Sequence, residues 1–183
     1  MPNPFVEAIE LVRSSAGRHG FRFALIGGFA LPFHGVRRTT GDVDFLVEEK
    51  GADDLHEDLR VAGYKALQRS GESANYRATD ERHVAIDLLY ARRRPALDML
   101  ERARVPATGL AVPVVDVEGL VGLKLQAMTN DPRRRRHDES DIVDLLAANL
   151  PSLDRSLLDA YFRLFDAEDE LGRFLEEARR RRA

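Results

Sequence analysis

Two apolar strands joined through a diglycine turn constrain the fold of this chain more than any other feature of its sequence. The apolar run Phe23 to Ile26 leads directly into Gly27-Gly28. Glycine adopts positive φ angles and leaves the backbone accessible, so a strand can turn sharply there into a helix whose first amides stay exposed. Pro32 and Gly35 limit that helix to a short one. The chain then returns through Asp42 to Val47, which has the apolar content of a second buried strand.

The diglycine turn and the acids of the second strand suit one chemistry. Free N–H groups and the positive end of a helix dipole favour phosphate. Asp42 and Asp44 are two residues apart on a strand, so both side chains leave the same face and can share cations. Magnesium usually binds one or two carboxylates together with substrate phosphates. Either feature alone is most often a plain turn or a solvated acidic edge, but their order predicts a nucleoside triphosphate held over divalent metal.

The same segment resembles the signature of the nucleotidyltransferase superfamily, in which a Gly-Gly or Gly-Ser turn precedes Asp-x-Asp on the next strand. Three stretches resemble, more narrowly, the AbiEii-type minimal nucleotidyltransferases, several of which are toxins of toxin–antitoxin pairs: Gly27-Gly28-Phe29-Ala30, His34-Gly35 and Arg38-Thr-Thr40-Gly-Asp42-Val-Asp44. The resemblance covers residues 22–48 and continues to about residue 146. It implies an α+β fold, with a nucleotidyltransferase-like mixed β-sheet core flanked by helices and a C-terminal helical bundle. It also implies that Arg38 and Thr40 join Gly27 and Gly28 in binding the nucleotide.

The hydrophobic periodicity of the remaining chain predicts strands mixed with helices, followed by helices alone. Helices are expected over 3–19, 51–62 and 94–104, strands over 64–68, 75–79 and 83–90, an extended stretch over 105–115, and helices over 116–129, 138–149, 154–165 and 167–181. We therefore expect a nucleotidyltransferase core over 1–115 and a helical part over 116–183 packed on it. With 183 residues in total, the two parts suit a single compact unit.

Composition excludes several classes of protein. The chain has no cysteine, which rules out disulfides and thiolate metal sites. It has no secretory signal and no apolar run long enough to span a bilayer, so we expect a cytoplasmic protein without a membrane partner. The net charge of −3 favours no nucleic acid overall, but arginines cluster at 92–94, 133–136 and 179–182. These clusters either hold an RNA backbone or a triphosphate, or are solvated loops and tails.

Asp87 stands alone among apolar neighbours in the stretch from His83 to Tyr90. A charge in the middle of a buried strand is costly unless it is paired or coordinates a cation. If this strand pairs with the Asp42–Asp44 strand, Asp87 is a third carboxylate at the same site. It would complete the metal site or act as general base toward an attacking hydroxyl. The alternative is an acid satisfied by a nearby arginine.

Lys124 lies on the apolar side of the helix expected over 116–129. The family resemblance implies that it contacts the triphosphate, and a salt bridge with Asp138 or Asp141 is the alternative. The two acids head the next helix, where the helix dipole alone favours them. The resemblance, which includes an Asp-x-x-Asp-aliphatic stretch, favours Asp141 as the one that binds nucleotide.

Together, these residues and the resemblance predict a metal-dependent nucleotidyltransferase. It would transfer a nucleoside monophosphate from a triphosphate such as ATP to an acceptor hydroxyl. Asp42, Asp44 and Asp87 would be the catalytic residues and the ligands of two Mg²⁺ ions, with Mn²⁺ as the alternative metal. The resemblance implies an RNA acceptor, in particular the 3′ end of transfer RNA, and a cognate antitoxin as partner. A protein side chain is the second acceptor. An antibiotic is the third, although its modifying enzymes usually have tryptophan where this chain has Phe29. A non-catalytic regulatory protein that kept the nucleotide fold is the alternative from another class.

Overall fold

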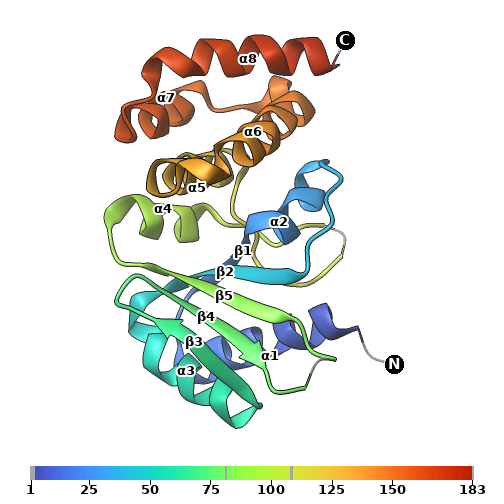
Figure 1. The fold of residues 1–183 in the computed structure, drawn as a ribbon, viewed down its shortest axis with the longest axis vertical. Coiled ribbons are helices and arrows are strands. Elements are labelled where there is room, and N and C mark those ends of the chain that lie inside the picture. Colours follow the sequence, from blue (N-terminus) through green and yellow to red (C-terminus); the bar gives the residue numbers. More distant parts are fainter. Residues whose placement is uncertain (1–2, 81, 108, 183) are drawn as a thin grey trace. The chain divides into compact units, whose positions relative to one another are not determined.

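The computed structural model describes residues 3–80, 82–107 and 109–182 of the chain. They form two units (Figure 1). The sheet unit consists of Met1–Ala30 and Arg38–Val115, and the helical unit of Leu31–Arg37 and Asp116–Ala183. Strands and helices share the first unit, and the second is entirely helical, so the expected α+β class is confirmed.

The sheet unit is built on one five-stranded mixed sheet with the order β1-β2-β5-β4-β3. In chain order the strands are β1 (Phe23–Ile26), β2 (Asp42–Glu48), β3 (Tyr64–Arg69), β4 (Ser73–Ala78) and β5 (Ala85–Ala91). The central neighbours β2 and β5 are parallel, and every other pair is antiparallel. Backbone hydrogen bonds from Leu25 to Pro113 and from Val115 to Leu25 cover the outer edge of β1 with the extended stretch that precedes the helical unit.

The two faces of this sheet differ in polarity because side chains alternate along each strand. Apolar side chains such as Phe45, Leu88 and Tyr76 are buried on one face. Two helices, α1 (Pro4–His19) and α3 (Ala52–Val61), lie on that side of the sheet (Figure 1). His56 of α3 lies 3.0 Å from the Tyr76 hydroxyl, which places α3 on the Tyr76 face. On the other side, α2 (Gly27–Ala30) and α4 (Arg94–Arg102) both contact β2.

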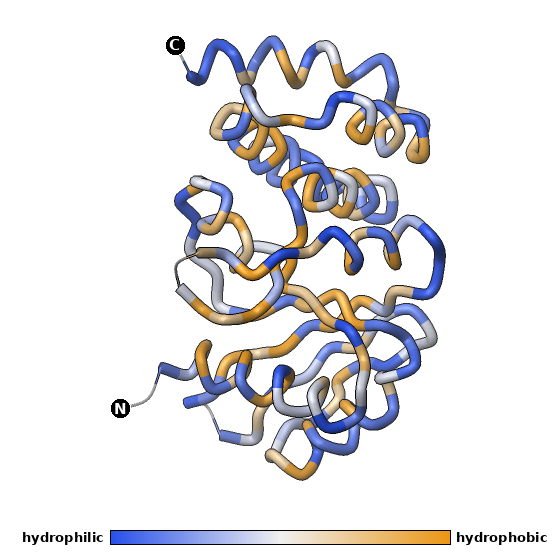
Figure 2. The backbone as a smooth tube through the Cα atoms, turned by 180° about the vertical axis from the view of Figure 1, so that it is seen from behind, coloured by the Kyte–Doolittle hydropathy of each residue, from blue (hydrophilic) through white to orange (hydrophobic). Residues whose placement is uncertain are grey.

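The helical unit packs four main helices around a core that includes Leu120, Leu145, Phe162 and Phe174. They are α5 (Val117–Asn130), α6 (Arg135–Asn149), α7 (Arg155–Leu164) and α8 (Glu168–Arg182), with short 3-10 turns at η1 (Leu31–His34), η3 (Pro132–Arg134) and η4 (Leu150–Ser152). Hydrophobic and hydrophilic residues alternate along α8, as expected of a helix with one packed side (Figure 2). None of the helices in the described ranges is long and apolar enough to span a membrane.

Two details of this architecture differ from the sequence-based expectations. The segment from Leu31 to Arg37 groups with the helices that follow residue 115, because the Asn149 side chain donates a hydrogen bond of 2.9 Å to the His34 carbonyl. The helix expected to begin at residue 138 begins at Arg135. The turn at Pro132–Arg134, which the Asp131 side chain caps by accepting from the Arg133 amide, leads straight into it.

Candidate active site

The pairing of β2 with β5 brings the predicted carboxylates onto one face of the sheet. Asp44 and Asp87 are direct partners across the two parallel strands, and Asp42 is paired with Ala85. Because side chains two apart on a strand share a face, all three acids leave the sheet on the same side. All three are half-buried, whereas the residues between them, Val43 and Ile86, are buried on the opposite face.

The diglycine turn lies directly against this group of acids. Gly27 follows β1 with a φ of 65°, and its predecessor Ile26 is paired with Asp44. A β-carbon on Gly27 would lie 2.1 Å from Oδ2 of Asp44, so only glycine fits at this position. A β-carbon on Gly28 would lie 3.1 Å from Cβ of Thr40. The turn is thus a place where backbone, the Asp44 carboxylate and the loop before β2 approach one another closely.

The helix that starts at this turn is short, as expected. It has four residues and passes into a 3-10 turn, so its dipole adds little, and any phosphate bound there would depend on individual backbone amides. Phe29 stacks on Phe5 of α1 with ring centroids 5.3 Å apart, which fixes the helix against the core of the sheet unit. The aromatic residue after the glycines therefore has a packing role in this chain.

Two neighbouring side chains hold the carboxylates by hydrogen bonds. The Thr40 hydroxyl donates to Oδ1 of Asp42, and the Asn75 amide donates to Oδ1 of Asp87 over 2.9 Å. Asn75 is the register partner of Asp87 on β4, so its side chain emerges on the same face. Within the described residues, Asp87 has no ion pair with an arginine, which was the alternative explanation for an acid on this strand. Sequence analysis missed Asn75, although the alternation Ser73-Ala-Asn75-Tyr-Arg77 is the signal that identifies it.

The donor set suits a hard divalent cation. It offers carboxylate oxygens and no thiolate or imidazole, which matches the preference of Mg²⁺ and Mn²⁺. No three His, Asp or Glu side chains in the described part of the chain converge closely enough to form a metal site by themselves. Magnesium commonly completes its coordination with water and substrate phosphate, so two adjacent carboxylates with a third opposite fit such an ion.

Lys124 and the late acids form a buried ion-pair group inside the helical unit. The ammonium of Lys124 lies 2.6 Å from Asp141 and 3.2 Å from Asp138. The side chain of Asp138 is 4% exposed and that of Asp141 is 6% exposed. The second carboxylate oxygen of Asp138 has no hydrogen-bond partner among the described residues. The salt bridge considered from sequence is therefore present. Binding of nucleotide by Lys124 and Asp141 stays a prediction.

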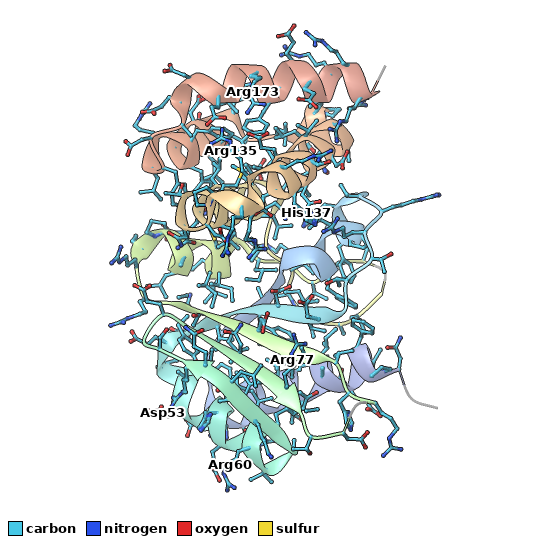
Figure 3. The ribbon with its side chains drawn as sticks, viewed as in Figure 1. Asp53, Arg60, Arg77, Arg135, His137 and Arg173 are labelled. Carbon is cyan, nitrogen blue, oxygen red and sulfur yellow. The ribbon has the colours of Figure 1, made fainter. Side chains whose placement is uncertain are left out.

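Most arginines of the three sequence clusters are paired with acids. Arg92 lies 2.9 Å from Glu49, Arg133 lies 2.9 Å from Asp131, and Arg181 lies 2.7 Å from Asp144. Arg135, labelled in Figure 3, contacts Glu170, which also pairs with Arg173 from outside the clusters. These partners offset much of the positive charge that made the clusters candidates for nucleic-acid binding.

Comparison with known families identifies this arrangement of strands and acids. A family model described as the nucleotidyl transferase AbiEii toxin of type IV toxin–antitoxin systems matches residues 11–182. The chain belongs to the AbiEii nucleotidyltransferase family. This AbiEii protein is accordingly an enzyme of nucleotidyl transfer, which favours catalysis over the non-catalytic binding protein considered from sequence. No curated protein sequence matches the chain.

Solved structures confirm the nucleotidyltransferase-like fold. The solution structure of the antibiotic-resistance factor ANT(2'')-Ia is similar with a TM-score of 0.63 and 13% identity, over 94% of this chain and 97% of that one. An antigenic nucleotidyltransferase-like protein from Paracoccidioides brasiliensis gives 0.55 and 17%, over 93% and 91%. The lincosamide antibiotic adenylyltransferase LnuA gives 0.51 and 13%, over 76% and 94%. At these identities the similarity concerns the fold of the AbiEii protein and not its substrate.

Proposed function

We propose that this AbiEii protein transfers a nucleoside monophosphate from a nucleoside triphosphate to a hydroxyl of RNA, at the 3′ end of transfer RNA, and thereby acts as a toxin opposed by a cognate antitoxin. The observation that carries the proposal is the placement of three carboxylates from β2 and β5 on one face, in contact with a glycine turn. The family description, a toxin of type IV toxin–antitoxin systems, supports the toxin role. Because nucleoside triphosphates are made in the cytoplasm, we propose that the enzyme acts there.

The proposed roles divide between the acids and the residues around the turn. Asp42, Asp44 and Asp87 would hold two Mg²⁺ ions, which, when bound, stabilise charge on the attacking and leaving oxygens. The proposed ligands of the nucleotide are Gly27, Gly28, Arg38, Thr40, Lys124 and Asp141. Because the two glycines have no side chain of their own, a phosphate can approach their backbone amides closely.

Transfer requires that the acceptor hydroxyl lose its proton, and a side chain of this protein can accept it. The acceptor oxygen forms a bond to the α-phosphorus, the bond from that phosphorus to the bridging oxygen breaks, and pyrophosphate leaves. In the alternative to its role as a metal ligand, Asp87 would accept the proton of the acceptor hydroxyl on Oδ2, since Oδ1 accepts a hydrogen bond from the Asn75 amide. Asn75 is in this scheme a positioning residue, which holds the carboxylate plane in one orientation.

The test compares two aspartate substitutions. The protein is incubated with each α-labelled nucleoside triphosphate, Mg²⁺ and total transfer RNA. We expect label in the RNA with the natural protein, and background labelling with Asp44→Asn. Asp53→Asn serves as control, because the side chain of Asp53 on α3 is 92% exposed, and the substitution should leave transfer unchanged. Asp53 is labelled in Figure 3. Circular dichroism would check that both variants fold.

Two results would contradict the proposal. Near-normal transfer by Asp44→Asn would refute the assignment of the carboxylate site. Labelling of protein or of an added antibiotic, with none in RNA, would keep the nucleotidyltransferase site but replace the acceptor.

A further inference from the structure

The sheet face that carries the three aspartates continues across β4 and β3. Asn75, the partner of Asp87, is followed two residues later on the same strand by Arg77, so Arg77 also lies on the aspartate face. Its partner on β3 is Lys65. Both side chains are exposed, and Arg77 is labelled beside the strands of the sheet in Figure 3. Two cations thus occupy the far half of the face on which the acids lie.

Lys65 and Arg77, here called the cation pair, are directly opposite each other. Cross-strand partners have β-carbons about 4.5–5.5 Å apart, and like charges in that position destabilise a sheet. Within the described residues neither side chain has a hydrogen bond or an ion pair. This differs from the arginine clusters, where most guanidiniums contact acids. Two unneutralised cations facing each other suit an anion supplied from outside the chain.

The strand order relates the cation pair to the reacting groups. The glycine turn follows β1, on one side of the aspartates, whereas β4 and β3 lie on the other side. Arg77 is diagonal to Asp87 across the β4–β5 pair, a separation of about 7–8 Å between strand positions. Ala85, two residues before Asp87 on β5, is the register partner of Asp42 and lies on the same face.

We infer that the cation pair binds backbone phosphates of the RNA acceptor next to the hydroxyl that reacts. This inference rests on the proposed function and adds the side of the sheet from which the acceptor approaches. If the glycine turn holds the phosphates of the donor, the acceptor must reach Asp87 from the β4 side. The terminal phosphodiesters of RNA closely follow its 3′ hydroxyl along the chain, so they meet Arg77 and Lys65 there.

The charge of this surface also discriminates between acceptor classes. A polyanion is attracted to two unpaired cations, and each phosphate contact releases counterions and adds affinity. A polycationic aminoglycoside would be repelled by the same side chains. The surface therefore favours RNA over the antibiotic acceptor that the similarity of fold alone would leave open.

The experiment measures transfer to total transfer RNA for Arg77→Gln and Lys65→Gln, with Arg77→Lys as the charge-retaining variant. Arg60→Gln is the matched control, since Arg60 is an exposed cation on α3, which covers the opposite face (Figure 3). We expect the KM for RNA to rise about tenfold in each glutamine variant, as for loss of a charge-assisted phosphate contact. The KM for the triphosphate should not change. The logarithm of kcat/KM should fall less steeply with the logarithm of salt concentration, by about 0.7 per lost contact with a single strand.

Each outcome decides between the inference and the proposed function. Natural KM and salt dependence in both glutamine variants, with RNA still labelled, would overturn the inference and leave the proposed function standing. If the KM for the triphosphate rises and the KM for RNA does not, the cation pair binds the donor triphosphate. That result would overturn the inference as well. No labelling of RNA by the natural protein would overturn the proposed acceptor and the inference together. Recovery of the natural KM in Arg77→Lys, with loss in Arg77→Gln, would support phosphate binding.

Discussion

Gly27 and Gly20 adopt nearly the same left-handed backbone conformation but differ in what surrounds them. Their φ angles are 65° and 69°. A β-carbon at Gly20 would meet nothing within 4 Å, whereas one at Gly27 would overlap the Asp44 carboxylate. Comparing substitutions at Gly20 and Gly27 therefore separates two effects of an added β-carbon: the conformational cost at positive φ, and the displacement of the Asp44 carboxylate.

Substitution of each glycine by alanine should have different consequences for activity. Both variants should lose about 1–2 kcal/mol of unfolding free energy, because a β-carbon disfavours the left-handed region. Only Gly27→Ala forces Asp44 to move, and a displacement of about 1 Å at a reacting centre can cost about 10²-fold in rate. We expect kcat to fall by about that factor in Gly27→Ala and to stay near normal in Gly20→Ala, as measured by label transfer and urea unfolding. Equal activity of the two variants would contradict the close approach of turn and carboxylate.

Residues whose roles depend on local pattern were predictable, and those that depend on distant partners were not. The acids at 42 and 44 are visible as a spacing of two within an apolar strand, and Asp87 as a lone charge among apolar residues. Asn75 gains its position only from the register between β4 and β5. The strand predicted over 75–79 starts two residues after the first residue of β4, Ser73. The predicted range therefore misses the alternation of Ser73, Asn75 and Arg77 on one face.

At the scale of elements, the strands and long helices were predictable because their apolar residues recur with a clear period. The short segment after α2 was not, since its partner in the fold is Asn149, 115 residues further along the chain. α6 begins three residues before the start predicted from the sequence, residue 138. The prediction is late because the run of arginines has the composition of a solvated turn. In the structure this run instead passes from the 3-10 turn at Pro132–Arg134 into α6, and Arg135 pairs with Glu170.

An ion pair whose strength depends on pH joins Arg22, just before β1, to Glu48 at the end of the neighbouring strand β2. Glu48 at the end of β2 accepts hydrogen bonds from the backbone and guanidinium of Arg22, at 3.1 and 3.0 Å. These contacts favour the ionised form and lower the pKa of Glu48 from 4.5 to about 2. A lowered pKa in the folded state stabilises the fold at pH values above the unfolded pKa. That stabilisation is lost as the pH falls from about 4.5 toward 2.

Glu48→Gln should therefore reduce stability at neutral pH and weaken its dependence on acid. We expect a loss of about 1.5–3 kcal/mol at pH 7, the range for a hydrogen bond to a charged group. The difference from the natural protein should shrink between pH 4.5 and 2, as urea unfolding at a series of pH values would measure. Glu57→Gln is the control, because its pair with Arg60 lies on the exposed surface of α3 and should contribute little. A constant difference at all pH values would mean that the ion pair is not the cause.

At the scale of the whole molecule, the two units divide the predicted site residues between them. The sheet unit contains the acids, the glycine turn and the cation pair, so its chemistry follows from strand order and register. The helical unit contains Lys124 and Asp141, which contact each other, and the ion pairs of this group extend to Asp138 and His137. The resemblance implies a second role for these residues that the ion pairs alone do not require.

Stability and nucleotide affinity can be separated by neutralising this buried group. Lys124→Met leaves the two buried carboxylates with the longer contacts of Arg134, 3.5 Å from Asp138, and His137, 3.9 Å from Asp141. Loss of one partner from a buried ion pair costs about 3–5 kcal/mol. A combined variant with Lys124→Met, Asp138→Asn and Asp141→Asn carries no charge at these three positions, so it should regain at least half of that loss in urea unfolding. If Lys124 and Asp141 also bind the triphosphate, the combined variant should fold yet show a KM for the triphosphate raised about tenfold, as for a lost charge-assisted contact. An unchanged KM in the folded combined variant would restrict both residues to holding the helical unit together, and the nucleotide would then be bound by residues of the sheet unit alone.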